Sequence, residues 1–220
     1  MYDVLNLVIL NAKIDAFKVH ETILLKTQLK EVDFMANDIL LLDRGYSSIG
    51  LLYELQHKNI GFCIQEKGNW FIEVNALLQK KETSKIVTFK LPQKDKNLLN
   101  TFKGQTDKVT VRIVVIELGD GKKEILCTSP TNAKEYTFDS LKQLYHFTWG
   151  IEETYKLFKV RADLESFSEI SALSVKQDFN AGIFSMNICA AINFPIEQKV
   201  REESKNANLK YTKIVNKTNA

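Results

Sequence analysis

The sequence predicts an α/β fold, and three features of its hydrophobic pattern support that class. An apolar run at 38–43 is followed by a helical pattern and then by a second apolar run at 59–66, which together form a strand–helix–strand unit. The block from Trp70 to Ser129 is rich in strand-like, β-branched runs. The segment after Thr137 has the cap and spacing of a long helix. We therefore expect a sheet covered by helices.

The length and composition are those of an ordinary globular protein. The chain has 220 residues, of which 45% are hydrophobic and 26% are charged, so it can bury a full core in one or two domains. The formal net charge is +3 at pH 7. This small excess permits nucleic-acid binding but does not require it.

The cysteines favour a reducing compartment. Cys63, Cys127 and Cys189 are odd in number, far apart and in apolar surroundings, so we expect reduced, buried thiols and a cytoplasmic location. No histidine pairs with a cysteine, so no zinc site is expected. The run from Phe179 to Ile196 lacks charge, but its asparagines and Pro195 favour a buried helix over a membrane span. No signal peptide is recognised.

The first part of the chain is expected to alternate strands and helices. The strand–helix–strand unit places Asp43 at the carboxyl end of its first strand, which is where open α/β sheets carry their chemistry. Ser47 or Ser48 caps the intervening helix. The expected elements are a strand at 7–14, a helix at 20–30, a strand at 38–43, a helix ending near Lys58 and a strand at 59–66.

A β-rich insertion is expected in the middle of the chain. Strands are predicted at 85–91, 109–118 and 122–129, with a hairpin turn at 119–121 between the last two. A polar stretch at 92–108 connects the first two strands.

The long helix after Thr137 carries an unusual stripe. Its members are Tyr145, Glu152, Tyr155 and Lys159. At about 100° per residue these positions share one side of a helix, where a core-facing helix would carry aliphatic residues. A further helix is predicted at about 171–194 and a polar tail at 197–220. The predicted division is 1–69, 70–130, 131–196 and 197–220.

Two motifs carry a family resemblance. Tyr145, Glu152 and Lys159 match the spacing Tyr-x2-Arg-x3-Glu-x6-Lys, and Asp43 begins a DRGY segment. The chain resembles the DDE transposases of bacterial insertion sequences marked by this signature, over about residues 2–194. The resemblance implies a ribonuclease-H-like mixed sheet flanked by helices, with a β-rich insertion before the glutamate helix. It also implies that Asp43 is the second catalytic aspartate.

Three departures from the family pattern are visible. Thr148 stands at the arginine position, and Glu169 stands where a glycine usually follows the helix. The first catalytic aspartate is expected on a strand before the YDVLN segment, which here begins at Tyr2. The resemblance therefore implies an N-terminally truncated copy that lacks its first strand and is catalytically impaired.

The resemblance implies metal-dependent phosphodiester cleavage and strand transfer. Asp43 and Glu152 are the implied catalytic residues and ligands of Mg²⁺ or Mn²⁺, since carboxylate oxygens suit these hard cations. From the pattern alone, a turn residue is the favoured interpretation of Asp43, and a solvated glutamate paired with Lys156 is that of Glu152; the resemblance reverses both.

DNA is the implied partner. Lys159 is the first candidate for a phosphate contact, and Tyr145 reads either as a base- or phosphate-contacting residue or as a packed aromatic. Weaker phosphate candidates are Arg44, Lys156 and Arg161. The expected partners are double-stranded DNA at transposon ends and target, and a homodimer or intact transposase, with no membrane. The alternative is a non-catalytic DNA-binding or oligomerising remnant of a transposase.

Overall fold

The computed structural model describes residues 1–15, 18–68, 71–80, 82–118, 121–161 and 171–207. For 72–73, 148–150, 152–155, 157–161, 201 and 205 it describes the backbone alone. The chain forms two compact units, Asp33–Trp149 and Met1–Val32 with Gly150–Ala220. The fourfold division expected from the sequence stays a prediction.

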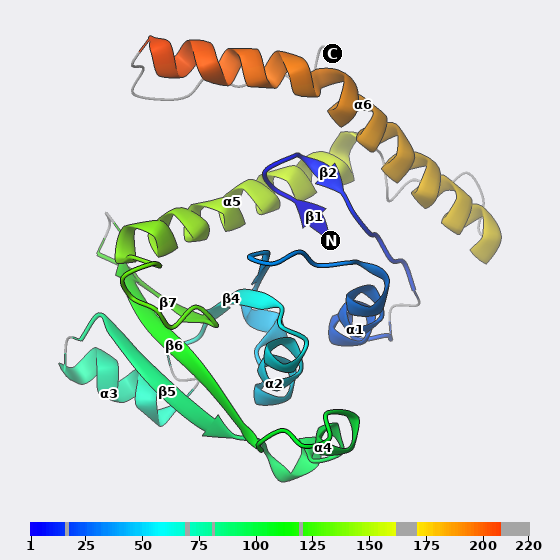
Figure 1. The fold of residues 1–220 in the computed structure, drawn as a ribbon. Helices are drawn as coiled ribbons and strands as arrows, with labels where there is room; N and C mark the ends of the chain where they lie inside the picture. The colour runs from blue at the N-terminus through cyan, green and yellow to red at the C-terminus, as the bar shows by residue number, and fades with distance from the viewer. Residues whose placement is uncertain (16–17, 69–70, 81, 119–120, 162–170, 208–220) are drawn as a thin grey trace. The chain divides into compact units, whose positions relative to one another are not determined.

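The unit Asp33–Trp149 is built on a five-stranded mixed sheet in the order β3-β4-β7-β6-β5 (Figure 1). Its strands are β3 (Ile39–Leu42), β4 (Gly61–Glu66), β5 (Ser84–Lys90), β6 (Lys108–Glu117) and β7 (Lys123–Thr128). Only β3 and β4 run parallel, with Leu42 in register with Ile64. The remaining neighbours are antiparallel. The predicted strand–helix–strand unit and the 109–129 hairpin are thus confirmed.

The helix α2 (Ile49–His57) packs against β4 and β6. Ser48 caps it, accepting a 3.2 Å hydrogen bond from the Leu51 amide, as one of the two predicted serines should. Its Leu52 and Leu55 are fully buried, as are Phe62 and Ile64 on β4. Because side chains alternate along a strand, these β4 residues lie on one face of the sheet and Cys63 lies on the other.

The opposite face of the sheet is covered by the start of α5 (Phe138–Arg161). Thr137 caps this helix, its hydroxyl oxygen accepting from the Ser140 amide at 3.2 Å, as predicted. Leu141 and Tyr145 are buried against a cluster on three strands. That cluster comprises Cys63, Val114, Ile116 and Leu126. The predicted long helix is therefore present, and its first turns help to form the core.

The middle of the chain is less purely β than expected. A helix, α3 (Ile72–Lys80), lies within the predicted β block, and its Val74 and Leu77 are buried. The stretch 92–108, predicted as a polar connection, is partly helical. It contains a 3-10 turn, η2 (Gln93–Asp95), and a short helix, α4 (Leu98–Thr101). The three predicted strands are present, but the β-rich pattern did not reveal α3, because a helix of nine residues is too short for its helical spacing to stand out.

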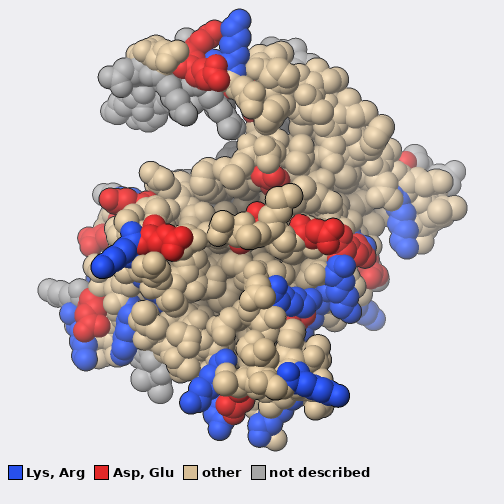
Figure 2. Space-filling model, viewed as in Figure 1, with Lys and Arg blue, Asp and Glu red and all other residues tan. Residues whose placement is uncertain are grey.

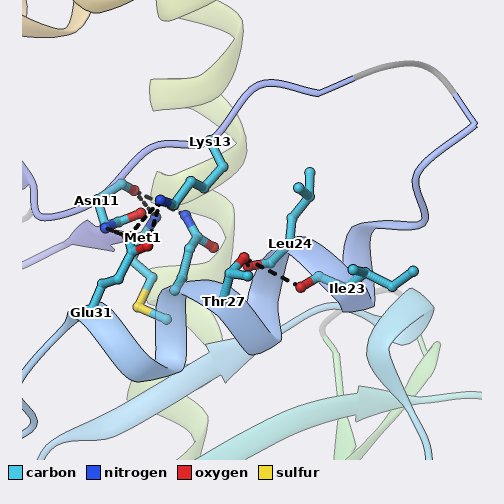
Figure 3. Close-up of polar contacts among 8 residues, drawn as sticks. Met1, Asn11, Lys13, Ile23, Leu24, Thr27 and Glu31 are labelled. Atoms are coloured by element: carbon cyan, nitrogen blue, oxygen red, sulfur yellow. Dashed lines mark hydrogen bonds and ion pairs between the residues drawn. The ribbon is translucent and has the colours of Figure 1, made fainter.

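The second unit contains the hairpin β1 (Tyr2–Asp3) and β2 (Val8–Ile9), with α1 (Glu21–Glu31). Figure 3 shows the polar contacts that link the segment after the hairpin to α1. Lys13 forms an ion pair of 2.6 Å with Glu31, and the Asn11 amide donates to the same carboxylate at 2.9 Å. The predicted strand at 7–14 is wrong, since only Val8–Ile9 pairs and Leu7 has a φ of 61°. The predicted helix at 20–30 is confirmed.

The last helix, α6 (Ala172–Asn206), runs past the predicted end at 194 and includes the first part of the predicted tail. Its apolar residues are not buried as expected, since Phe184 and Ile192 are each 67% exposed. By length and composition alone, Ala172–Ser204 is able to cross a membrane. Asn187 anchors this helix to the hairpin by donating to the Ile9 carbonyl at 2.9 Å and accepting from the Ile9 amide at 2.8 Å.

Candidate functional site

Asp43 lies directly after β3, at the carboxyl end of the parallel pair, as predicted. It is exposed, and its Oδ1 accepts a 2.6 Å hydrogen bond from the Arg44 amide. This contact caps the 3-10 turn η1 (Arg44–Tyr46). Asp43 therefore serves as a turn residue, one of its two predicted roles, and still presents its other carboxylate oxygen at the surface.

The face of the sheet to which Asp43 belongs follows from strand alternation. Its backbone is still extended, with φ −81° and ψ 170°, so its side chain continues the side of Leu41. Leu41 packs against the cluster that Leu141 and Tyr145 of α5 complete. Asp43 therefore projects from the face that the start of α5 covers.

Glu124 and Gln65 are polar neighbours of Arg44 at the start of the turn. The Arg44 guanidinium pairs with Glu124 at 2.7 Å, and the Gln65 amide donates to the same oxygen at 2.7 Å. Glu124 is largely shielded, with 14% of its side chain exposed. Because this carboxylate already neutralises Arg44, the arginine is held at the sheet edge and is a weaker phosphate contact than a free guanidinium.

Glu66, at the carboxyl end of β4, was not singled out from the sequence. It is 3% exposed, and its Oε1 accepts from the Ser47 hydroxyl at 2.8 Å, while Oε2 has no hydrogen-bond partner among the described residues. Burial raises the pKa of Glu66 to about 8, although the Ser47 hydrogen bond acts in the opposite direction. The signal was present, since Phe62, Ile64 and Glu66 alternate onto one buried face.

The predicted residues of α5 share one continuous helix. Tyr145 is 3% exposed and belongs to the core, which favours the packed-aromatic alternative over contact with a displaced base. Lys156 is exposed. Glu152 follows Tyr145 by two turns, about 10 Å along the axis. The side chains of Glu152, Lys159 and Arg161 lie outside the described residues.

The donor chemistry of Asp43 fits a hard divalent cation, because it offers an exposed carboxylate oxygen at a strand end. Glu66 does not join it, since strand alternation places it on the opposite face. Within the described ranges, no group of three or more His, Cys, Asp or Glu residues is arranged to hold a metal ion. Burial raises the pKa of the Cys63 thiol to about 12, so this cysteine is a poor metal ligand.

Comparison with known proteins adds one finding. The family model described as "Transposase DDE domain" matches residues 1–188. A search of curated proteins found no match. The match extends over the β3 strand, the central sheet, all of α5 and the first half of α6.

Proposed function

Because the chain belongs to the family of transposase DDE domains, we propose that it acts on DNA by metal-dependent phosphodiester cleavage and strand transfer. The observation that carries this proposal is the position of Asp43, an exposed carboxylate after a parallel strand on the face covered by α5. The spacing of Tyr145, Glu152 and Lys159 supports the further proposal that the chain belongs to the insertion-sequence group with the Tyr…Glu…Lys signature. Its substrates are then transposon ends and target DNA.

We propose Asp43 and Glu152 as the residues that hold the divalent ion, Mg²⁺ or Mn²⁺. Such an ion, when bound, supplies Lewis-acid activation of the attacking oxygen and charge stabilisation of the leaving oxygen. The role of Asp43 is to offer its free oxygen while Oδ1 stays fixed by the Arg44 amide at 2.6 Å. This hydrogen bond limits rotation of the carboxylate and so orients the donor.

The positive residues of α5 are proposed to position DNA. Lys156 and Lys159 follow Glu152 at four and seven residues, so all three lie on one side of the helix. Arg161 is a further candidate on the last turn. Thr148, at the arginine position of the signature, lacks the planar fork that binds phosphate, so DNA engagement is weaker there.

The proposal is tested by incubating supercoiled plasmid with the protein and Mg²⁺ or Mn²⁺. Metal-dependent nicking should be lost in Asp43→Asn and in Glu152→Gln. Glu153→Gln is the matched control, because it removes the adjacent carboxylate from the same helix and should keep the activity. Nicking that persists in Asp43→Asn and Glu152→Gln contradicts the proposal. Salt-sensitive DNA binding without any nicking would favour the alternative of a non-catalytic DNA-binding or oligomerising protein.

A cytoplasmic location and self-association complete the proposal. Cys63, Cys127 and Cys189 are free, which suits a reducing compartment. Cys63 and Cys127 are buried as expected, whereas Cys189 is exposed, so the expectation of burial was wrong there. A homodimer or a complex with intact transposase is expected because both DNA ends must be held for strand transfer. Size-exclusion chromatography with light scattering, with and without DNA, tests this expectation, and a monomer in both conditions contradicts it.

A further inference from the structure

Residues 90–108 form a short, strongly basic segment, which we call the lysine lobe. It contains five lysines, two aspartates and no glutamate or arginine, a net charge of +3. The whole chain also has a net charge of +3, so the other 201 residues sum to zero. The lobe is therefore one of two strongly basic segments of the chain, the other being residues 204–220, with four lysines and no acidic residue.

Inside the lobe, the positive and the negative side chains differ in their exposure to solvent. All five lysines are exposed, whereas Asp95 and Asp107 are half-buried. Asp95 lies against Gly50 of α2, where an added β-carbon would come within 2.8 Å of its Cγ. Asp107 pairs with Lys90 at 3.4 Å. Lys94, Lys96, Lys103 and Lys108 have no ion pair or hydrogen bond of their side chains to any described residue. Figure 2 shows Lys and Arg side chains (blue) gathered around the α4 region.

The lobe is fixed to α2 rather than loosely attached. Phe102 lies against two rings of α2, with centroid distances of 6.0 Å to Tyr53 and 5.6 Å to His57. The Thr110 amide, just after the lobe, donates to Gln56 at 3.1 Å. These contacts hold the lysines at a defined place on the same unit as Asp43, whose turn leads into α2.

One feature of the lobe works against stability. Lys90 and Lys108 are paired across the β5–β6 ladder, so two like charges stand directly opposite each other at its open end. Such a pair destabilises a sheet, and of the two lysines only Lys90 has an acidic partner in the part of the chain that the structure describes. A surface on which two positively charged lysines lie opposite each other is suited to binding a polyanion, which would neutralise both charges.

We propose that the lysine lobe is a sequence-independent binding surface for the phosphate backbone of duplex DNA, separate from the Asp43 turn. This inference about the lysine lobe rests on the proposed function, in which DNA is the substrate. Lysines act as flexible point charges and lack the fork geometry that arginine uses to read guanine, so the lobe contacts phosphates and not bases. Its function is to hold DNA beside the site irrespective of sequence.

The test compares two triple variants of equal charge change. Lys94→Gln, Lys96→Gln and Lys103→Gln neutralise the lobe, while Lys30→Gln, Lys134→Gln and Lys199→Gln neutralise three exposed lysines elsewhere. Binding to a fluorescent 30-bp duplex of random sequence is measured from about 50 to 250 mM KCl without divalent ions. Each lost phosphate contact makes the slope of log K against log salt shallower by about 0.9. The lobe triple should therefore lose about 2–3 of slope, and the control triple should keep the wild-type slope.

Equal slopes in the two triples, or no binding of duplex DNA by the wild type, overturn the proposal. If the lobe triple variant binds DNA as the wild type does but no longer binds phosphatidylserine vesicles, DNA is not the ligand of the lobe and the proposal is overturned. The single variant Lys108→Gln is an independent test. It should weaken DNA binding, while the free energy of unfolding stays the same or rises because the repulsion between Lys90 and Lys108 is removed. The plasmid-nicking assay reports on Asp43 and Glu152 separately, so failure of the proposed chemistry and failure of the lobe are distinguishable.

Discussion

The buried carboxyl of Glu66 should make the stability of this protein fall as the pH rises. Glu66→Gln is the informative change, because the amide keeps the shape of the side chain and an oxygen that accepts from Ser47. The variant removes only the ability to ionise. In the wild type, ionisation of Glu66 requires a charge in a site that is 3% exposed, with one oxygen unpartnered.

The magnitude follows from the two pKa values. The ordinary pKa of a glutamate is 4.5, and burial raises that of Glu66 to about 8 in the folded protein. Between these values the folded state holds a proton that the unfolded state has released. The free energy of unfolding therefore decreases with rising pH, by about 1.4 kcal/mol per pH unit. Between pH 5 and pH 7 this amounts to about 2–3 kcal/mol, and the loss levels off above pH 8.

Urea unfolding followed by circular dichroism at pH 5, 6 and 7 measures this slope. The Glu66→Gln variant should lack the 2–3 kcal/mol decrease and should be more stable than the wild type at pH 7 by about that amount. Glu117→Gln, which removes an exposed carboxylate from the same sheet, should behave like the wild type. Parallel pH profiles for the wild type and Glu66→Gln would refute the account of this buried acid.

Three further changes probe other contacts. Ser48→Ala removes the cap of α2 and should cost about 1 kcal/mol in urea unfolding; no loss contradicts the capping role. Asn187→Ala leaves both backbone groups of Ile9 without this partner and should cost about 1–3 kcal/mol. An unchanged midpoint of urea unfolding would show that the Asn187–Ile9 hydrogen bonds do not anchor α6 to the hairpin. Thr148→Arg should tighten DNA binding and steepen the salt slope by about 0.9, whereas Thr148→Gln should not; identical titrations for both variants argue against a phosphate contact.

The parts of the fold that the sequence predicted best are local. The run at 38–43, the cap at Ser48 and the run at 59–66 lie close together in the chain, and each element needs only its own pattern and end signals. The long helix after Thr137 was predicted for the same reason. Asp43 could be placed because a strand end is a local feature.

The parts that failed depend on distant partners. The segment at 7–14 has strand propensity, but only Val8–Ile9 pairs, and Ile9 takes its hydrogen bonds from Asn187, 178 residues away. The apolar run at 179–196 was expected to be buried because of its composition, and composition does not specify what covers a helix. Glu66 was missed because a glutamate at a strand end is usually exposed, although its alternation with Phe62 and Ile64 placed it on a buried face.

Metal binding by Asp43 and Glu152 is tested most directly by a double-mutant cycle in Mn²⁺ affinity. Electron paramagnetic resonance titration of the wild type, Asp43→Asn, Glu152→Gln and the double variant gives the four affinities. If the two carboxylates share an ion, each single variant binds Mn²⁺ more weakly and the coupling energy exceeds about 1 kcal/mol. Strictly additive losses, or single variants that bind as tightly as the wild type, would contradict the shared site.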